Sequence, residues 1–233
     1  MSKIKYVFLD LDDTLFDFHK SEGKALSKTL TSLGIEPTVE NLALYSRINR
    51  SQWESLERGE VTRDVLLVRR FEILFLELGI KGKEPKEAQR LYEGNLCREY
   101  HYLPGAIELI EALLGKYKLY LASNGTAVVQ DSRIALSGIG KYFDGIFISE
   151  RIGYNKPSKE FFDGCFATIK DFSKDEAIII GDSLTSDILG GINAGIKTCL
   201  YNPKRKPNNT GTVPDYEVAA LAEIPDLLLT IQN

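Results

Sequence analysis

The chain has 233 residues, of which 43% are hydrophobic and 27% are charged, as expected of a globular protein with one large domain or a domain that carries an insertion. Its formal net charge of −4 gives no electrostatic support for binding a nucleic-acid polymer or a membrane surface. The chain has three widely spaced cysteines and no C-x-x-C pair, which argues against a cysteine-based zinc site. The sparse cysteines, the lack of a signal-peptide pattern and the lack of a membrane-spanning apolar run together predict a cytoplasmic protein.

The first predicted element is a strand over Ile4 to Leu9, which is followed at once by a cluster of aspartates. The strand is apolar from Tyr6 onward and leads directly into Asp10, Asp12 and Asp13. Residues two apart in an extended segment face the same way. We therefore expect Asp10 and Asp12 to address one site, with Asp13 turned elsewhere.

The next zone, from about residue 20 to 101, is predicted to be entirely helical. Its apolar residues recur at spacings of three and four, which indicates one buried face per helix. Four helices are predicted, with starts and stops marked by Gly34, Thr38, Gly59, Thr62, Gly79 and Pro85. This zone therefore predicts a separate helical domain.

From about residue 103 onward, apolar strands alternate with helical segments. The predicted strands are Lys118–Ala122, Gly145–Ile148, Ala177–Ile180 and Lys197–Tyr201. Nearly continuous apolar strands between helices are typical of a parallel sheet covered on both faces. The predicted fold is therefore α/β, with a core of residues 1–17 and 102–233 and an all-helical domain of residues 18–101 inserted into it.

Polar residues follow the strands at the points where each strand ends. Asp10 follows the first, Ser123 and Asn124 the second, and Asp182 the fourth, while Lys156 lies just beyond the third. Because parallel strands end at one edge of a sheet, we expect these groups to converge there. Clustered carboxylates favour a hard divalent cation such as Mg²⁺, and the added hydroxyl and ammonium suit a phosphate.

The motifs "DLDDTL", "SNG", "KP" and "GDSLTSD" occur in this order and resemble the four motifs of the haloacid dehalogenase-like hydrolase superfamily. The resemblance spans the whole chain and implies a Rossmann-like core with a helical cap. More narrowly, the chain resembles the bacterial pyrimidine 5′-nucleotidases in Trp53, in "RFE" at 70–72, in "ISERIGYNKP" from Ile148 and in "SDILGGINAG" from Ser186.

The resemblance also implies a role for each matching residue. Asp10 is expected to be the nucleophile and a metal ligand, and Asp12 the general acid and base with its backbone carbonyl on the metal. Asp182 is expected to bind the metal directly, and Asp187 through water. The groups expected to bind phosphate are Ser123, Asn124 and Lys156.

Several of these residues allow a structural alternative. Asp182 and Asp187 could cap the helix that follows Gly181, and Ser123 could be a turn residue. Thr14 is expected to fix its loop by a hydrogen bond. Trp53 and Arg70 could belong to the helical interior or line the substrate side of the cap.

The predicted function is a Mg²⁺-dependent phosphatase that acts on small phosphomonoesters, above all nucleoside 5′-monophosphates, through an aspartyl-phosphate. A phosphosugar phosphatase or mutase is the main alternative. Two further alternatives fit the sequence less well. A haloacid dehalogenase attacks carbon and needs no protonating group at Asp12. A phospho-acceptor signalling domain places its acceptor aspartate after a later strand, in a shorter chain. The expected partner is the small-molecule substrate, with the protein as a monomer or homodimer.

Overall fold

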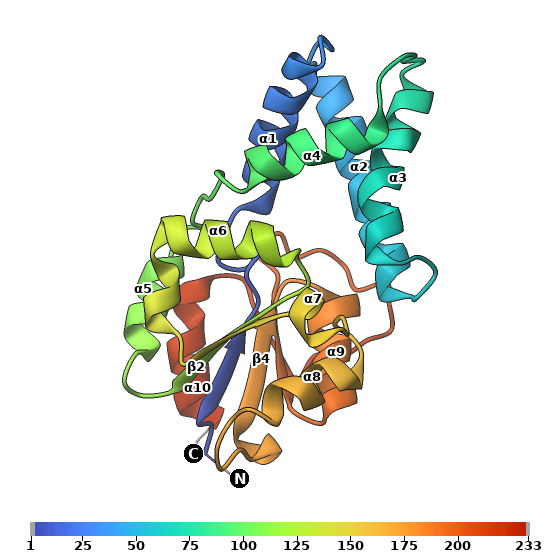
Figure 1. Cartoon of the computed structure of the whole chain (residues 1–233). Helices are drawn as coiled ribbons and strands as arrows, with labels where there is room; N and C mark the ends of the chain where they lie inside the picture. Colours follow the sequence, from blue (N-terminus) through green and yellow to red (C-terminus); the bar gives the residue numbers. More distant parts are fainter. Residues whose placement is uncertain (1–2, 232–233) are drawn as a thin grey trace. The chain divides into compact units, whose positions relative to one another are not determined.

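The computed structural model describes residues 3–231, which form two compact units. One unit runs up to Asp17 and continues from Tyr102 onward, and the other is Phe18–His101 (Figure 1). Among the described residues, none of the helices combines the length and the hydropathy needed to cross a membrane.

The first unit is built on a six-stranded sheet in which every neighbouring pair is parallel. The strand order is β3-β2-β1-β4-β5-β6, so β1 lies between β2 and β4. The strands are β1 (Tyr6–Leu9), β2 (Lys118–Ser123), β3 (Gly145–Ile148), β4 (Ala177–Gly181), β5 (Lys197–Tyr201) and β6 (Tyr216–Val218). This sheet confirms the predicted α/β class, and β6 is an edge strand that was not predicted.

Helices cover both faces of the sheet, as the apolar strands require. Figure 1 shows α5 and α10 on one side and α8 and α9 on the other. The helices of this unit are α5 (Ala106–Leu113), α6 (Ala127–Ser137), α7 (Ser149–Ile152), α8 (Lys159–Phe166), α9 (Leu189–Ala194) and α10 (Ile224–Ile231). A short π-helical turn, η3 (Leu184–Ile188), connects β4 to α9.

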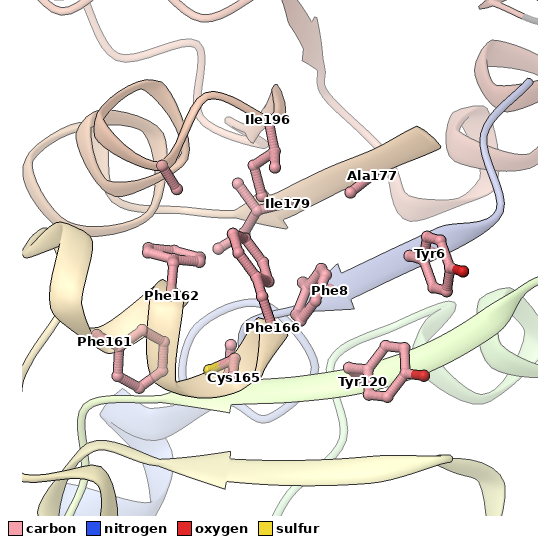
Figure 2. Packing of buried hydrophobic residues seen from close by; sticks show 12 residues of the cluster. Tyr6, Phe8, Tyr120, Phe161, Phe162, Cys165, Phe166, Ala177, Ile179 and Ile196 are labelled. Carbon is pink, nitrogen blue, oxygen red and sulfur yellow. The ribbon is translucent and has the colours of Figure 1, made fainter. Parts of the chain in front are cut away.

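An aromatic cluster fixes β1 against α8 (Figure 2). Phe8 is fully buried, stacks on Tyr120 of β2 at 5.1 Å between ring centroids, and meets Phe166 of α8 edge-on at 5.7 Å. Each such side chain contributes about 1.5–3 kcal/mol through burial. The carboxyl end of β1 is therefore held in a rigid position.

The chain leaves this unit and returns to it at neighbouring points. Phe16 and Tyr102 form an antiparallel bridge, and their rings pack edge to face at 5.2 Å. The amide of Leu103 donates to the carbonyl of Leu15 at 2.9 Å. Both ends of the inserted segment are thus anchored in the sheet-containing unit.

The second unit contains the four predicted helices. They are α1 (Phe18–Ser32), α2 (Val39–Glu57), α3 (Arg63–Glu77) and α4 (Pro85–Leu96). Thr38 caps α2 as predicted, because its Oγ1 accepts the Asn41 amide at 3.2 Å.

Arg70 lies in the interior of this helical unit, where its side chain is 4% exposed. Its guanidinium donates to Asn49 Oδ1 and Gln89 Oε1, both at 2.7 Å, and lies over the rings of three aromatic side chains. Asn49 in turn donates to buried Glu22 at 2.7 Å. Arg70 therefore has a structural role in this unit, whereas Trp53 is half-buried on α2.

Candidate active site

The carboxyl edge of the sheet carries the polar residues that the sequence places at the strand ends. Leu9 is in register with Leu121 of β2 and Ile180 of β4. Asp10 therefore follows the central strand, between the ends of β2 and β4. Because the neighbouring strands are parallel, their terminal residues meet at this edge.

Lys156 connects three of these segments. Its Nζ donates to Asp10 Oδ1, to Asp187 Oδ1 and to the carbonyl of Ala122, each at 2.6 Å. The residue is 1% exposed. Burial alone would lower the pKa of this ammonium, but the charges of Asp10 and Asp187 raise its pKa above the ordinary value. Lys156 is therefore a charged group fixed beside Asp10.

Asp10, Asp182 and Asp187 form a group that could hold a metal ion. One carboxylate oxygen from each lies within 4.8 Å of the others. Burial and, next, the charge of Asp187 raise the pKa of Asp10 to about 7 despite Lys156. Burial followed by the charges of Asp10 and Asp187 raises the pKa of Asp182 well above its ordinary value. Carboxylates this close repel one another, so a bound divalent cation would relieve the repulsion.

Asp187 is held on both of its carboxylate oxygens. Oδ1 accepts from Lys156, and Oδ2 accepts the amide of Ser183 at 3.1 Å. A Cβ at Gly181 would lie 2.1 Å from Asp187 Oδ2, so only glycine fits beside it. The side-chain cap of the following turn is Ser183, whose Oγ accepts the Ser186 amide. The side-chain cap of this turn is therefore not Asp182 or Asp187, which were the two candidates from the sequence.

Asn124 and Ser123 follow β2 and have different surroundings. The Asn124 side chain bonds the backbone of Lys156 on both sides, with Oδ1 accepting its amide at 2.8 Å and Nδ2 donating to its carbonyl at 2.9 Å. The side chain of Asn124 thus fixes the Lys156 segment. Ser123 Oγ accepts from the amide of Gly125 at 3.2 Å and from Gln130 Nε2 at 2.8 Å.

The Asp12 carboxylate is bound by two residues of α6 that carried no signal in the sequence. Arg133 Nη1 donates to Asp12 Oδ1 at 2.7 Å, and Gln130 Nε2 donates to Asp12 Oδ2 at 2.7 Å. The Asp12 carboxylate is not part of the three-aspartate group. A polar residue on a helix usually faces solvent, so only the fold reveals this pair.

The loop after Asp10 has an unusual backbone at Asp13, and one expectation is not met at Thr14. Asp13 has a left-handed backbone with φ of +62°, which aspartate tolerates better than most residues, and its amide donates to Phe16. Thr14 was expected to fix the loop by a hydrogen bond, but its buried Oγ1 has no hydrogen-bond partner among residues 3–231. That expectation was wrong.

Comparison with known proteins identifies the family of this chain. The model of the haloacid dehalogenase-like hydrolases matches residues 4–195. The pyrimidine 5′-nucleotidase PynA of Streptococcus pneumoniae is 37% identical over 96% of this chain and 94% of its own length. The pyrimidine 5′-nucleotidase YjjG of Escherichia coli is 32% identical, over 97% of this chain and 98% of its own.

A solved structure agrees with both sequence comparisons. The crystal structure of the HAD-hydrolase YfnB from Bacillus subtilis, which is bound to magnesium, matches with a TM-score of 0.92 and 36% identity. The match covers 97% of this chain and 99% of that one. The similarity therefore extends over both compact units.

Proposed function

Because this chain belongs to the haloacid dehalogenase-like hydrolases, and its relatives make it a phosphomonoester hydrolase, we propose that it is a Mg²⁺-dependent nucleoside 5′-monophosphatase that works through an aspartyl-phosphate on Asp10. The observation that carries this proposal is the buried ammonium of Lys156, which bonds Asp10 and Asp187 at 2.6 Å beside Asp182. The proposed nucleophile, a buried ammonium and the carboxylates proposed to bind the metal thus lie at one edge of the sheet.

Two displacements at phosphorus make up the proposed reaction. In the first, an Asp10 carboxylate oxygen bonds to phosphorus as the ester bond breaks, and protonated Asp12 gives its proton to the departing alkoxide. In the second, Asp12 takes a proton from a water that attacks phosphorus, which releases inorganic phosphate and regenerates Asp10. Such proton transfers are worth ~10²–10⁴ in rate.

The other residues supply charge and orientation. Lys156 keeps Asp10 in place and offers positive charge to the phosphoryl oxygens, and Ser123 offers its hydroxyl to the same group. Asp10, Asp182 and the backbone carbonyl of Asp12 would bind Mg²⁺ directly and Asp187 would do so through water, and the ion would neutralise phosphoryl charge. We assign Phe18–His101 as the cap that selects the leaving group.

The nucleotide preference rests on the relatives, since PynA and YjjG are pyrimidine 5′-nucleotidases. Among the described residues the three cysteines form no disulfide, which suits a reducing compartment and therefore the cytoplasm. The direct test measures phosphate release from nucleoside monophosphates and sugar phosphates with and without Mg²⁺. A pyrimidine monophosphate should be the best substrate, and a preference for sugar phosphates would overturn the assignment.

A pair of matched variants tests the mechanism. Asp10→Asn should abolish Mg²⁺-dependent phosphate release, whereas Asp13→Asn, in the same loop, should retain it because asparagine also tolerates the left-handed backbone. Full activity of Asp10→Asn would refute the aspartyl-phosphate. Product analysis covers the mutase alternative, because a mutase returns the phosphoryl group to a substrate hydroxyl and releases little inorganic phosphate.

A further inference from the structure

Helix α6 places two buried polar side chains against the proposed reaction centre. Gln130 is 1% exposed and Arg133 is 0% exposed. They are three residues apart, which puts them on the same face of the helix. The Arg133 guanidinium also lies over the ring of buried Phe16, 5.2 Å from its centroid. Burial of a cation and an amide is costly unless both are bonded, so their partners indicate what they do.

The two side chains and Asp12 form a closed ring of hydrogen bonds. Arg133 Nη1 donates to Asp12 Oδ1 at 2.7 Å and to Gln130 Oε1 at 2.9 Å. Gln130 Nε2 then donates to the other carboxylate oxygen, Asp12 Oδ2, at 2.7 Å. Both oxygens of Asp12 are therefore bound from one helix, which leaves the carboxylate little freedom to rotate.

Gln130 also extends this ring to Ser123. Its Nε2 has two protons, and it donates to Ser123 Oγ at 2.8 Å as well as to Asp12. The Gly125 amide also donates to Ser123 Oγ, at 3.2 Å. A hydroxyl has two acceptor sites and one proton. With both acceptor sites used, the Ser123 hydroxyl is set to act as a donor, which is what a phosphoryl oxygen requires.

The glycine of the "SNG" motif makes room for this arrangement. A Cβ at Gly125 would lie 2.4 Å from Gln130 Nε2, far inside contact distance. Gly125 does not have the positive φ that usually explains a glycine. The need for glycine at this position therefore comes from the position of the Gln130 side chain.

We propose that Gln130 and Arg133 are positioning residues for the phosphatase reaction: Arg133 orients Asp12 and supports Gln130, and Gln130 orients both Asp12 and Ser123. This inference rests on the proposed function. Positioning matters because a misplacement of about 1 Å can cost ~10²-fold in rate. Neither residue forms or breaks a covalent bond in the proposed reaction, so each acts through the group that it holds.

The two residues should give different kinetic signatures. Arg133→Met should lower kcat for a nucleoside monophosphate by ~10–100-fold and change KM less than Gln130→Met does, because Arg133 reaches Ser123 only through Gln130. Gln130→Met should lower kcat similarly and also raise KM, because Ser123 loses its orientation. Both should slow the first turnover of p-nitrophenyl phosphate much less, because nitrophenolate leaves without being protonated.

The control is Asp131→Asn, on the same helix, whose side chain is 46% exposed and pairs with exposed Arg151 at the surface. It should leave both kinetic constants unchanged. Circular dichroism and thermal unfolding show whether each variant folds. If Arg133→Met does not fold, the positioning role is tested with Gln130→Met, in which a neutral side chain of similar size replaces the amide.

Several results would overturn the positioning role. These are wild-type kcat in Gln130→Met, equal losses with both substrates, or a rate lost only in proportion to thermal stability. A wild-type protein without phosphatase activity would instead refute the proposed function, so the two failures are distinguishable.

Discussion

Lys156→Met is the substitution with the most specific expected consequence for stability. It removes an ammonium that makes three hydrogen bonds of 2.6 Å and leaves Asp10 and Asp187 buried without it. Removing one partner of a buried ion pair typically costs about 3–5 kcal/mol. We expect that loss in the free energy of unfolding at pH 8, measured by urea denaturation in the presence of a chelator.

The loss should shrink at low pH. Burial already raises the pKa of Asp10 to about 7, and Lys156 is the largest influence that lowers it, so the substitution raises that pKa further. Below this pKa the Asp10 carboxyl group is protonated in the wild-type protein and in the variant, so the Lys156 ammonium keeps only its bonds to Asp187 and to the Ala122 carbonyl. The destabilisation should therefore be smaller at pH 5 than at pH 8 and grow as the pH rises through 7.

The wild-type protein provides a check on the sign. A carboxyl group with a raised folded pKa binds more protons when folded, so metal-free stability should fall as the pH rises from about 4 to 7. The control Lys159→Met removes an exposed lysine of α8 and should cost less than about 0.5 kcal/mol at either pH. Equal destabilisation by Lys156→Met at pH 5 and pH 8 would contradict this electrostatic account.

Three further predictions concern separate features. Gly125→Ala displaces the Gln130 side chain and should lower nucleotide kcat about 10-fold; unchanged kinetics would show that the space is not needed. Arg70→Met leaves two buried amide oxygens without a donor and should lower the free energy of unfolding, measured by urea denaturation, by about 2–4 kcal/mol. An unchanged free energy of unfolding would show that water replaces the guanidinium. Mg²⁺ at 100 times its Kd should add about 2.7 kcal/mol to the free energy of unfolding, and Asp182→Asn should remove most of that gain.

Most of the fold follows from local sequence signals, because each element combines one clear periodicity with a defined end. The predicted strands match β1 to β5 within two residues, and the four helices of the second unit begin and end near the predicted threonine, proline and glycine positions. Strand β6 could not be predicted. It is only three residues long and lies at the edge of the sheet beside β5, so neither length nor alternation marks it.

The candidate site was predictable where residues follow strands or match the motifs of the family. Asp10, Ser123 and Asp182 were identified because parallel strands end at one edge, and their proposed roles await the tests above. Gln130 and Arg133 were missed because their proposed role depends on hydrogen bonds to Asp12, which is more than one hundred residues away in the sequence. No periodicity separates a buried arginine from a solvated one.

The bridge between Phe16 and Tyr102 has a consequence for how such a protein can change its substrate. The segment between them leaves and returns at adjacent points, so the sheet does not depend on how many residues lie between. An insertion of another length could start and finish at the same two residues without disturbing the strand ends. The residues proposed to cleave the phosphate ester lie in one unit, and the segment proposed to select the leaving group forms the other. Substitutions or insertions in the second unit can therefore change the substrate without changing the site at the strand ends.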